Sequence, residues 1–229
     1  MQFQAPESLS EQIAQHLGRQ IILGKLQPGE RIQELKVVGD LNVSRGSVRE
    51  ALLILERRHL IRIYPRKGAV VSGMTPELVN SLYDIYLNLL EMLAVRFMAE
   101  RTPADEQPLL QAIDQLCRRL GDERTDVAEV IDGGLEVMRK CYPVVANPYL
   151  EETLENFRPA ISRTYYLVLA NDPEEMQVSR RFFRRIAERL QADDHQGVTS
   201  VIREFGEHQR AVALQALARD ESLTVEPAT

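Results

Sequence analysis

The stretch NVSRGSVREALLILERR, residues 42–58, begins with small polar residues and continues as a helix with one apolar face. Residues four apart lie on the same side of a helix, so Arg45 and Arg49 project together. The other side carries the apolar residues Val48, Leu52 and Leu55. The stretch therefore predicts a helix that is capped by Ser44, buries one face and presents two arginines near its start.

The start of this helix is suited to contact with a polyanion. Ser44, Gly46 and Ser47 are small enough for a phosphate backbone to approach closely. The free N–H groups and the positive end of the helix dipole favour an anion there, and arginine donates paired hydrogen bonds to guanine edges and phosphates. Two interpretations stay open at this point: a recognition helix that enters a major groove, or an amphipathic helix whose arginines face water.

The neighbouring segments predict the rest of a small domain. Helices are expected over residues 8–24 and 33–41, and the short strands IRIYP and GAVVS enclose a tip formed by Arg66, Lys67 and Gly68. This order of elements is that of a winged helix-turn-helix, which we place at residues 1–73. The basic tip can touch a neighbouring phosphate or minor groove, so it favours the DNA-binding interpretation.

Residues 76–222 carry the pattern of an all-helical bundle. Four helix starts pair a capping residue with proline: Thr75-Pro76, Thr102-Pro103, Asn147-Pro148 and Asp172-Pro173. Two further helices are expected over residues 126–144 and 196–219. The predicted fold is therefore mainly α, an N-terminal winged helix-turn-helix followed by a bundle of six helices, with residues 73–76 as the junction.

The composition narrows the class of protein. The 229 residues are 44% hydrophobic and 27% charged, which allows a sizeable core. No apolar run approaches the roughly 20 residues of a membrane span, and two cysteines in a chain of this length suggest a reducing compartment. A cytoplasmic protein without a membrane partner is expected.

The net charge of -6 is unevenly distributed. Residues 1–73 carry 11 Lys/Arg against 7 Asp/Glu, whereas the remainder carries 17 against 27. A mildly basic head on an acidic body fits a protein that binds a polyanion with its head alone.

Three segments in order, LGRQIILGKLQPGERIQE, NVSRGSVREALLILERRHLI and YPRKGAVV, resemble the DNA-binding domain of GntR-family bacterial regulators. The later segments LYDIYLNLLEMLAVRFMAER and NPYL resemble the effector domain of the FadR-type subgroup, called FCD. The resemblance covers nearly the whole chain. It implies a homodimeric transcription factor, here expected to be a repressor, that binds an inverted-repeat operator in double-stranded DNA with an affinity altered by a small molecule.

The resemblance also implies which residues meet DNA. By position, Arg45, Ser47 and Arg49 match DNA-contacting residues of the family, and residues 66–68 match the wing. With the small residues that flank them, the expected DNA-binding set is Ser44, Arg45, Gly46, Ser47, Arg49, Arg66, Lys67 and Gly68.

The effector domain departs from its relatives. Many of them hold a divalent metal with one aspartate and three histidines, but the corresponding positions here are Gly134, Met138, Phe183 and Phe205. An arginine that relatives use for carboxylate ligands corresponds to Tyr86. No metal and no other cofactor is therefore expected. The predicted effector cavity is lined by Tyr86, Met138, Phe183, Phe205 and His208, which suits an apolar ligand such as an acyl chain or an aromatic ring.

Two alternatives to a ligand-responsive repressor stay open. The chain could be a helical ligand-binding or metal-dependent protein, even an enzyme, although it lacks a nucleophile elbow and a Gly-rich phosphate loop. It could also bind DNA constitutively, with its own side chains filling the effector pocket, because methionine and phenylalanine at helical spacing most often form core.

Overall fold

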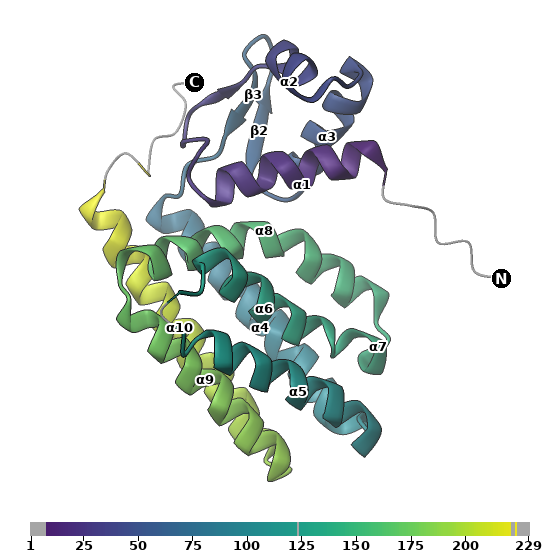
Figure 1. Ribbon diagram of the computed structural model, residues 1–229, viewed down its shortest axis with the longest axis vertical. Helices are drawn as coiled ribbons and strands as arrows, with labels where there is room; N and C mark the ends of the chain where they lie inside the picture. The colour runs from purple at the N-terminus through teal and green to yellow at the C-terminus, as the bar shows by residue number, and fades with distance from the viewer. Residues whose placement is uncertain (1–7, 123, 221–222, 224–229) are drawn as a thin grey trace, which may run out of the picture. The chain divides into compact units, whose positions relative to one another are not determined.

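The computed structural model describes residues 8–122, 124–220 and 223. These residues form two compact units (Figure 1). One comprises the described residues up to Thr75 together with Asp220 and Leu223, and the other comprises Pro76–Arg219. The main-chain N–H of Met74 donates to the carbonyl oxygen of Leu223 at 3.0 Å. The expected span of 76–222 therefore extends past the helical unit, which ends with its last helix at Arg219.

The first unit has the element order of a winged helix-turn-helix, as predicted. Its elements are α1 (Leu9–Ile22), β1 (Arg31–Ile32), α2 (Glu34–Leu41), α3 (Arg45–Arg57), β2 (Ile61–Tyr64) and β3 (Gly68–Val71). Strand β1 was not predicted, because two residues are too few to leave a periodic pattern. The three strands form an antiparallel sheet in the order β1-β3-β2.

The core of this unit joins all three helices to the sheet. Helix α1 packs against α3, and α2 also packs against α3. The predicted apolar face of α3 is fully buried, with Val48, Leu52 and Leu55 at most 3% exposed. The sheet contributes Ile61 and Val71, which pair across β2 and β3 and are also buried. This packing fixes the opposite, polar face of α3 toward solvent.

The second unit is a helical bundle. Its elements are α4 (Pro76–Glu100), α5 (Pro103–Arg119), α6 (Val127–Arg139), α7 (Tyr142–Val145), α8 (Pro148–Asn171), α9 (Glu174–Gln191) and α10 (His195–Arg219). Helices α9 and α10 run side by side, and α4 packs against both α8 and α10 (Figure 1). The predicted caps at Thr102 and Asn147 are present, with the Asn147 side chain accepting from the Leu150 N–H at 3.1 Å.

Two details of the bundle differ from the sequence prediction. The single helix expected over residues 126–144 is divided into α6 and α7, because Pro143 lacks an N–H and its ring would clash with the carbonyl of Arg139. The described part of the bundle therefore has seven helices instead of six. Helix α9 begins at Glu174, with Pro173 as the capping residue, while Asp172 ends α8 and its carboxylate accepts from the Glu174 N–H at 2.9 Å.

Helix α4 is long and apolar enough, by length and composition, to cross a membrane. No such stretch was expected from the sequence. In this fold, however, Tyr83, Leu87 and Phe97 of α4 are buried, and the helix packs against α8 and α10. We therefore regard α4 as a core helix of the bundle.

Candidate nucleic-acid interface and effector cavity

The start of α3 is open to solvent and ordered by its own side chains. Ser44 caps the helix: its hydroxyl oxygen accepts from the Ser47 N–H at 3.1 Å, and the two serine hydroxyls lie 2.9 Å apart. Asn42, in the left-handed conformation with φ 52°, ends α2 and turns the chain into α3. A Cβ added at Gly46 would meet only the Ser44 hydroxyl oxygen, at 3.7 Å. This turn thus leaves open space where a phosphate can approach.

The two arginines of α3 lie on its exposed face. Arg45 and Arg49 are both exposed, as the four-residue spacing predicts. The Arg49 Nε donates to Glu34 Oε2 at 3.0 Å, so a carboxylate of α2 holds this guanidinium. The pair is largely solvated, with 69% of the Arg49 side chain exposed, and surface pairs of this kind are weak. Arg49 can therefore leave Glu34 when a phosphate or a guanine edge is offered.

The wing is the turn between β2 and β3. Arg66 is exposed and adopts φ 68°, and Gly68 follows with φ 79°. Lys67, between them, is also exposed. Arg66 and Lys67 thus share one exposed turn in the same unit as α3, and the partly exposed Gly68 begins β3 next to it.

Sequence reasoning missed Arg31. Strand β1 pairs Arg31 with Val70, so its exposed side chain reaches the base of the wing. A Cβ added at Gly68 would lie 3.7 Å from the Arg31 guanidinium. Only the pairing of β1 with β3 brings these residues together, and the two-residue strand gave no signal of it.

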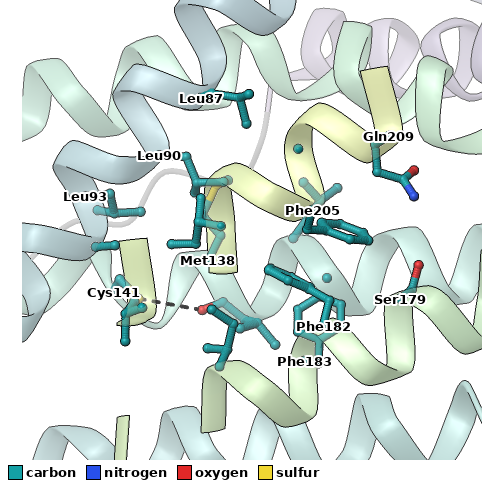
Figure 2. A pocket seen from close by; sticks show the side chains of 18 of the residues that line it. Leu87, Leu90, Leu93, Met138, Cys141, Ser179, Phe182, Phe183, Phe205 and Gln209 are labelled. Atoms are coloured by element: carbon teal, nitrogen blue, oxygen red, sulfur yellow. Dashed lines mark hydrogen bonds between the residues drawn. The ribbon is translucent and has the colours of Figure 1, made fainter. Parts of the chain in front are cut away.

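The helical unit contains an apolar cavity of about 150 Å³. Of the predicted effector residues, Tyr86, Met138, Phe183 and Phe205 line it, from four different helices. The rings of Phe182 and Phe205 are stacked with centroids 4.1 Å apart, and Phe183 meets Phe182 edge-on at 4.8 Å. In the view of Figure 2 these rings lie between Met138 on one side and Ser179 and Gln209 on the other.

His208 is not among the residues that line this cavity. Its ring is exposed and its Nε2 lies 2.9 Å from Glu175 Oε1. The next residue, Gln209, is buried, lines the cavity and donates from its amide to Glu175 Oε2 at 2.9 Å. The Glu175 carboxylate on α9 thus holds the His208 ring outside the cavity, and Gln209 takes the place at the cavity wall.

The residues at the family's metal-binding positions do not fit a metal ion. Gly134, Met138, Phe183 and Phe205 all line the cavity. A Cβ added at Gly134 would lie 3.4 Å from the Phe183 ring, so these positions face one another. None of the four side chains offers a carboxylate, imidazole or thiolate, the side-chain ligands that divalent metals commonly take. Within the described ranges, no three His, Cys, Asp or Glu side chains form a group that could hold a metal.

The two cysteines are poor nucleophiles. Burial raises the pKa of Cys141 to about 12 and also raises the pKa of Cys117. Both are free thiols, and a protonated thiol is unreactive. We assign them no role in either site.

Comparisons with known proteins agree with this division. Residues 9–71 match the family described as bacterial regulatory proteins, gntR family, and residues 82–208 match the FCD domain. The HTH-type transcriptional regulator McbR of Escherichia coli (strain K12) is 25% identical over 93% of this chain and 96% of its own length. The gluconate operon transcriptional repressor of Bacillus subtilis (strain 168) is 34% identical over 48% of this chain and 43% of its own length.

Solved structures share the fold. The structure titled E. coli McbR/YncC superposes with a TM-score of 0.77 at 22% identity, covering 92% of this chain and 99% of that one. A GntR regulator from Rhodococcus sp. RHA1 gives a TM-score of 0.72 at 21% identity, covering 93% of this chain and 100% of that one. The GntR family comprises transcriptional regulators, not enzymes. The chain therefore belongs to the GntR family of bacterial regulatory proteins and is a transcriptional regulator with an FCD effector domain.

Proposed function

We propose that this regulator is a cytoplasmic homodimeric repressor that binds an inverted-repeat operator and responds to an apolar effector without a metal ion. The observation that carries the proposal is the exposed start of α3, where Arg45 and Arg49 project beside the open turn at Gly46. The wing residues Arg66 and Lys67 provide further positive charge in the same unit. Base edges are read by the arginines, and the Ser44 hydroxyl and the wing hold phosphates.

A second copy of the chain is the proposed partner of α4. This helix exposes an apolar stripe with heptad-like spacing, in which Leu78, Ile85 and Met92 are 40%, 51% and 47% exposed. Leu82 and Leu89 lie between them and are half-buried. Apolar residues alternating at three and four positions are suited to packing against an identical helix. A two-fold dimer explains why the operator is expected to be an inverted repeat.

Repression is proposed from a relative. The gluconate operon repressor of Bacillus subtilis is 34% identical over 48% of this chain and 43% of its own length. Control by an effector is proposed from the cavity of about 150 Å³, because a pocket filled by its own side chains would leave no such space. The cavity therefore favours a ligand-responsive regulator over a constitutive DNA binder.

The proposal is tested by selecting bound duplexes from a random DNA library with the purified protein. Enrichment of an inverted repeat is expected, and its half-site spacing would report the geometry of the dimer. With that operator, Arg49→Ala should reduce affinity by about 1–3 kcal/mol if the arginine makes a bidentate guanine contact. Arg57→Ala, at the exposed far end of the same helix, is the matched control and should change affinity little.

Failure of the folded protein to enrich any sequence would contradict the proposal. An equal loss for Arg49→Ala on operator and random DNA would instead make Arg49 a phosphate contact, because such contacts carry no sequence information.

A further inference from the structure

We infer that the cavity of the helical unit takes an uncharged ligand, about the size of a substituted benzene ring, whose hydrogen-bond acceptor is received by the hydroxyls of Tyr86 and Tyr165. The chemical class of this ligand is inferred from the residues and the volume of the cavity alone. Only the ligand's role as an effector rests on the proposed function.

The lining of the cavity carries no ionisable acid or base other than tyrosine and cysteine. Its polar members are Tyr86, Cys141, Tyr165, Ser179 and Gln209, and all other lining side chains are apolar or glycine. Burying a charge without a partner costs far more than burying a neutral polar group. A carboxylate ligand would therefore find no cation to compensate it, and an uncharged ligand is selected.

Two tyrosines that line the cavity carry hydroxyl groups without a good hydrogen-bond acceptor among the described residues. Tyr86 is 3% exposed, and among the described residues its hydroxyl hydrogen-bonds only the Met138 sulfur, at 3.7 Å. A thioether is a weak acceptor. Tyr165 also lines the cavity, and no group in the described part of the chain hydrogen-bonds its hydroxyl. A ligand oxygen within reach of both hydroxyls would satisfy both donors.

Both tyrosines stay protonated at physiological pH. Burial, and then the neighbouring Tyr165, raises the pKa of Tyr86 well above its ordinary value. Burial also raises the pKa of Tyr165. Both groups are therefore neutral and keep a proton to donate, which an acceptor on the ligand such as a carbonyl or ether oxygen would receive.

The size and the walls of the cavity indicate the rest of the ligand. An engineered cavity of about 150 Å³ lined by apolar side chains binds benzene, and this cavity has about the same volume. The stacked rings of Phe182 and Phe205 form part of its wall. A ring on the ligand can pack against them in an offset or edge-on arrangement. A long acyl chain would not fit without rearrangement of these side chains.

The inference is tested with three probes that have the same number of non-hydrogen atoms: acetophenone, cumene and benzoate. Acetophenone carries a neutral acceptor, cumene carries none, and benzoate is an anion. Binding to the full-length protein is measured by ligand-observed NMR titration and by thermal shift. Acetophenone is expected to bind most tightly and benzoate most weakly.

Substitution of the tyrosines tests whether their hydroxyls donate to the acceptor of the ligand. Tyr86→Phe and Tyr165→Phe should each weaken acetophenone binding about threefold to tenfold, the range expected for one neutral hydrogen bond, and leave cumene binding unchanged. Tyr83→Phe is the matched control: Tyr83 is a buried tyrosine of the same helix, but its hydroxyl lies 3.0 Å from the Thr164 hydroxyl and it does not line the cavity. It should leave the preference among the three probes unchanged.

The outcomes separate this inference from the proposed function. Benzoate or cumene binding as tightly as acetophenone, or no binding of any probe to the folded protein, would overturn the inference while operator binding remained intact. Selective binding of acetophenone that is lost in the two tyrosine variants but leaves operator affinity unchanged would uphold the inference and contradict the effector role.

Discussion

The fold of the protein does not require a glycine at position 46. A Cβ there would touch only the Ser44 hydroxyl oxygen at an ordinary 3.7 Å, and alanine favours a helix over glycine by up to about 1 kcal/mol. We expect Gly46→Ala to leave the free energy of unfolding unchanged or slightly higher, but to reduce operator affinity, because the methyl group occupies the space of an approaching phosphate. Chemical denaturation and gel-shift titration measure the two quantities separately.

Gly39→Ala is the control for this prediction, since Gly39 in α2 also has open space around it. Gly39→Ala should likewise leave the free energy of unfolding unchanged or slightly higher, but it should not reduce operator affinity. If both variants bind DNA as the native protein does, the α3 turn does not approach a phosphate.

Single residues also mark what the sequence could and could not predict at the sites. The exposure of Arg45 and Arg49 followed from helical spacing alone. The Glu34 partner of Arg49 did not, because it depends on how α2 packs against α3. Similarly, His208 and Gln209 both lie within one turn of Phe205, and only the position of Glu175 on α9 decides which one faces the cavity.

At the scale of the helices, Glu155 of α8 joins three elements. Its carboxylate accepts from Arg139 of α6 at 3.0 Å, from Tyr142 of α7 at 3.3 Å, and pairs with Arg158 of its own helix. Burial raises the pKa of Glu155, but the hydrogen bond from Arg139 and the charges of Arg158 and Arg139 outweigh it, so this pKa lies below its usual value.

We expect Glu155→Gln to destabilise the protein by about 1–3 kcal/mol at neutral pH, because the arginines lose a half-buried partner. A lowered folded-state pKa contributes stability above the unfolded value, and this contribution is lost as pH falls through the folded value. The difference in unfolding free energy between native protein and variant should therefore be full at pH 7 and disappear in acid. A difference that persists unchanged in acid would show that the glutamate acts through packing and not through its charge.

The exposed stripe of α4 makes a prediction about assembly. Ile85→Asp would place an unpaired carboxylate in the proposed dimer contact, and burying such a charge is costly. We expect the dimer dissociation constant to rise at least about tenfold, measured by analytical ultracentrifugation, with a parallel loss of operator affinity. Tyr149→Asp is the control: Tyr149 on α8 is 80% exposed and lies outside the stripe, so the substitution should leave the dimer intact.

The helices themselves were predictable where their signals are local. At the start of α5 the Asp105 carboxylate accepts from the Thr102 N–H, and at the start of α8 the Asn147 side chain accepts from the Leu150 N–H. In each pair the partners are three residues apart, so the sequence contains both. The break at Pro143 also has a local signal in the sequence, the proline itself. The two-residue strand β1 has none, because two residues cannot show a repeat and β1 exists only through its pairing with β3.

For the whole molecule, the number of DNA-binding heads can be read from salt dependence. Each phosphate neutralised on duplex DNA contributes a slope of about -0.9 to the plot of log affinity against log salt. Arg66→Asn removes one wing charge per chain while keeping a residue type that tolerates the positive φ of this position. The slope should become shallower by about 2 if two copies bind together and by about 1 if a single head binds. An unchanged slope would mean that the wing does not touch a phosphate.

The uncharged lining of the cavity has a consequence for how the regulator receives its signal. The transfer of an uncharged molecule from water to hydrocarbon costs little free energy, whereas the transfer of an ion costs a great deal. Such a molecule diffuses through a lipid bilayer without a dedicated importer. Under the proposed effector control, the concentration that reaches the regulator would then follow the concentration outside the cell, and transcription would respond to the surroundings even before any uptake gene is expressed.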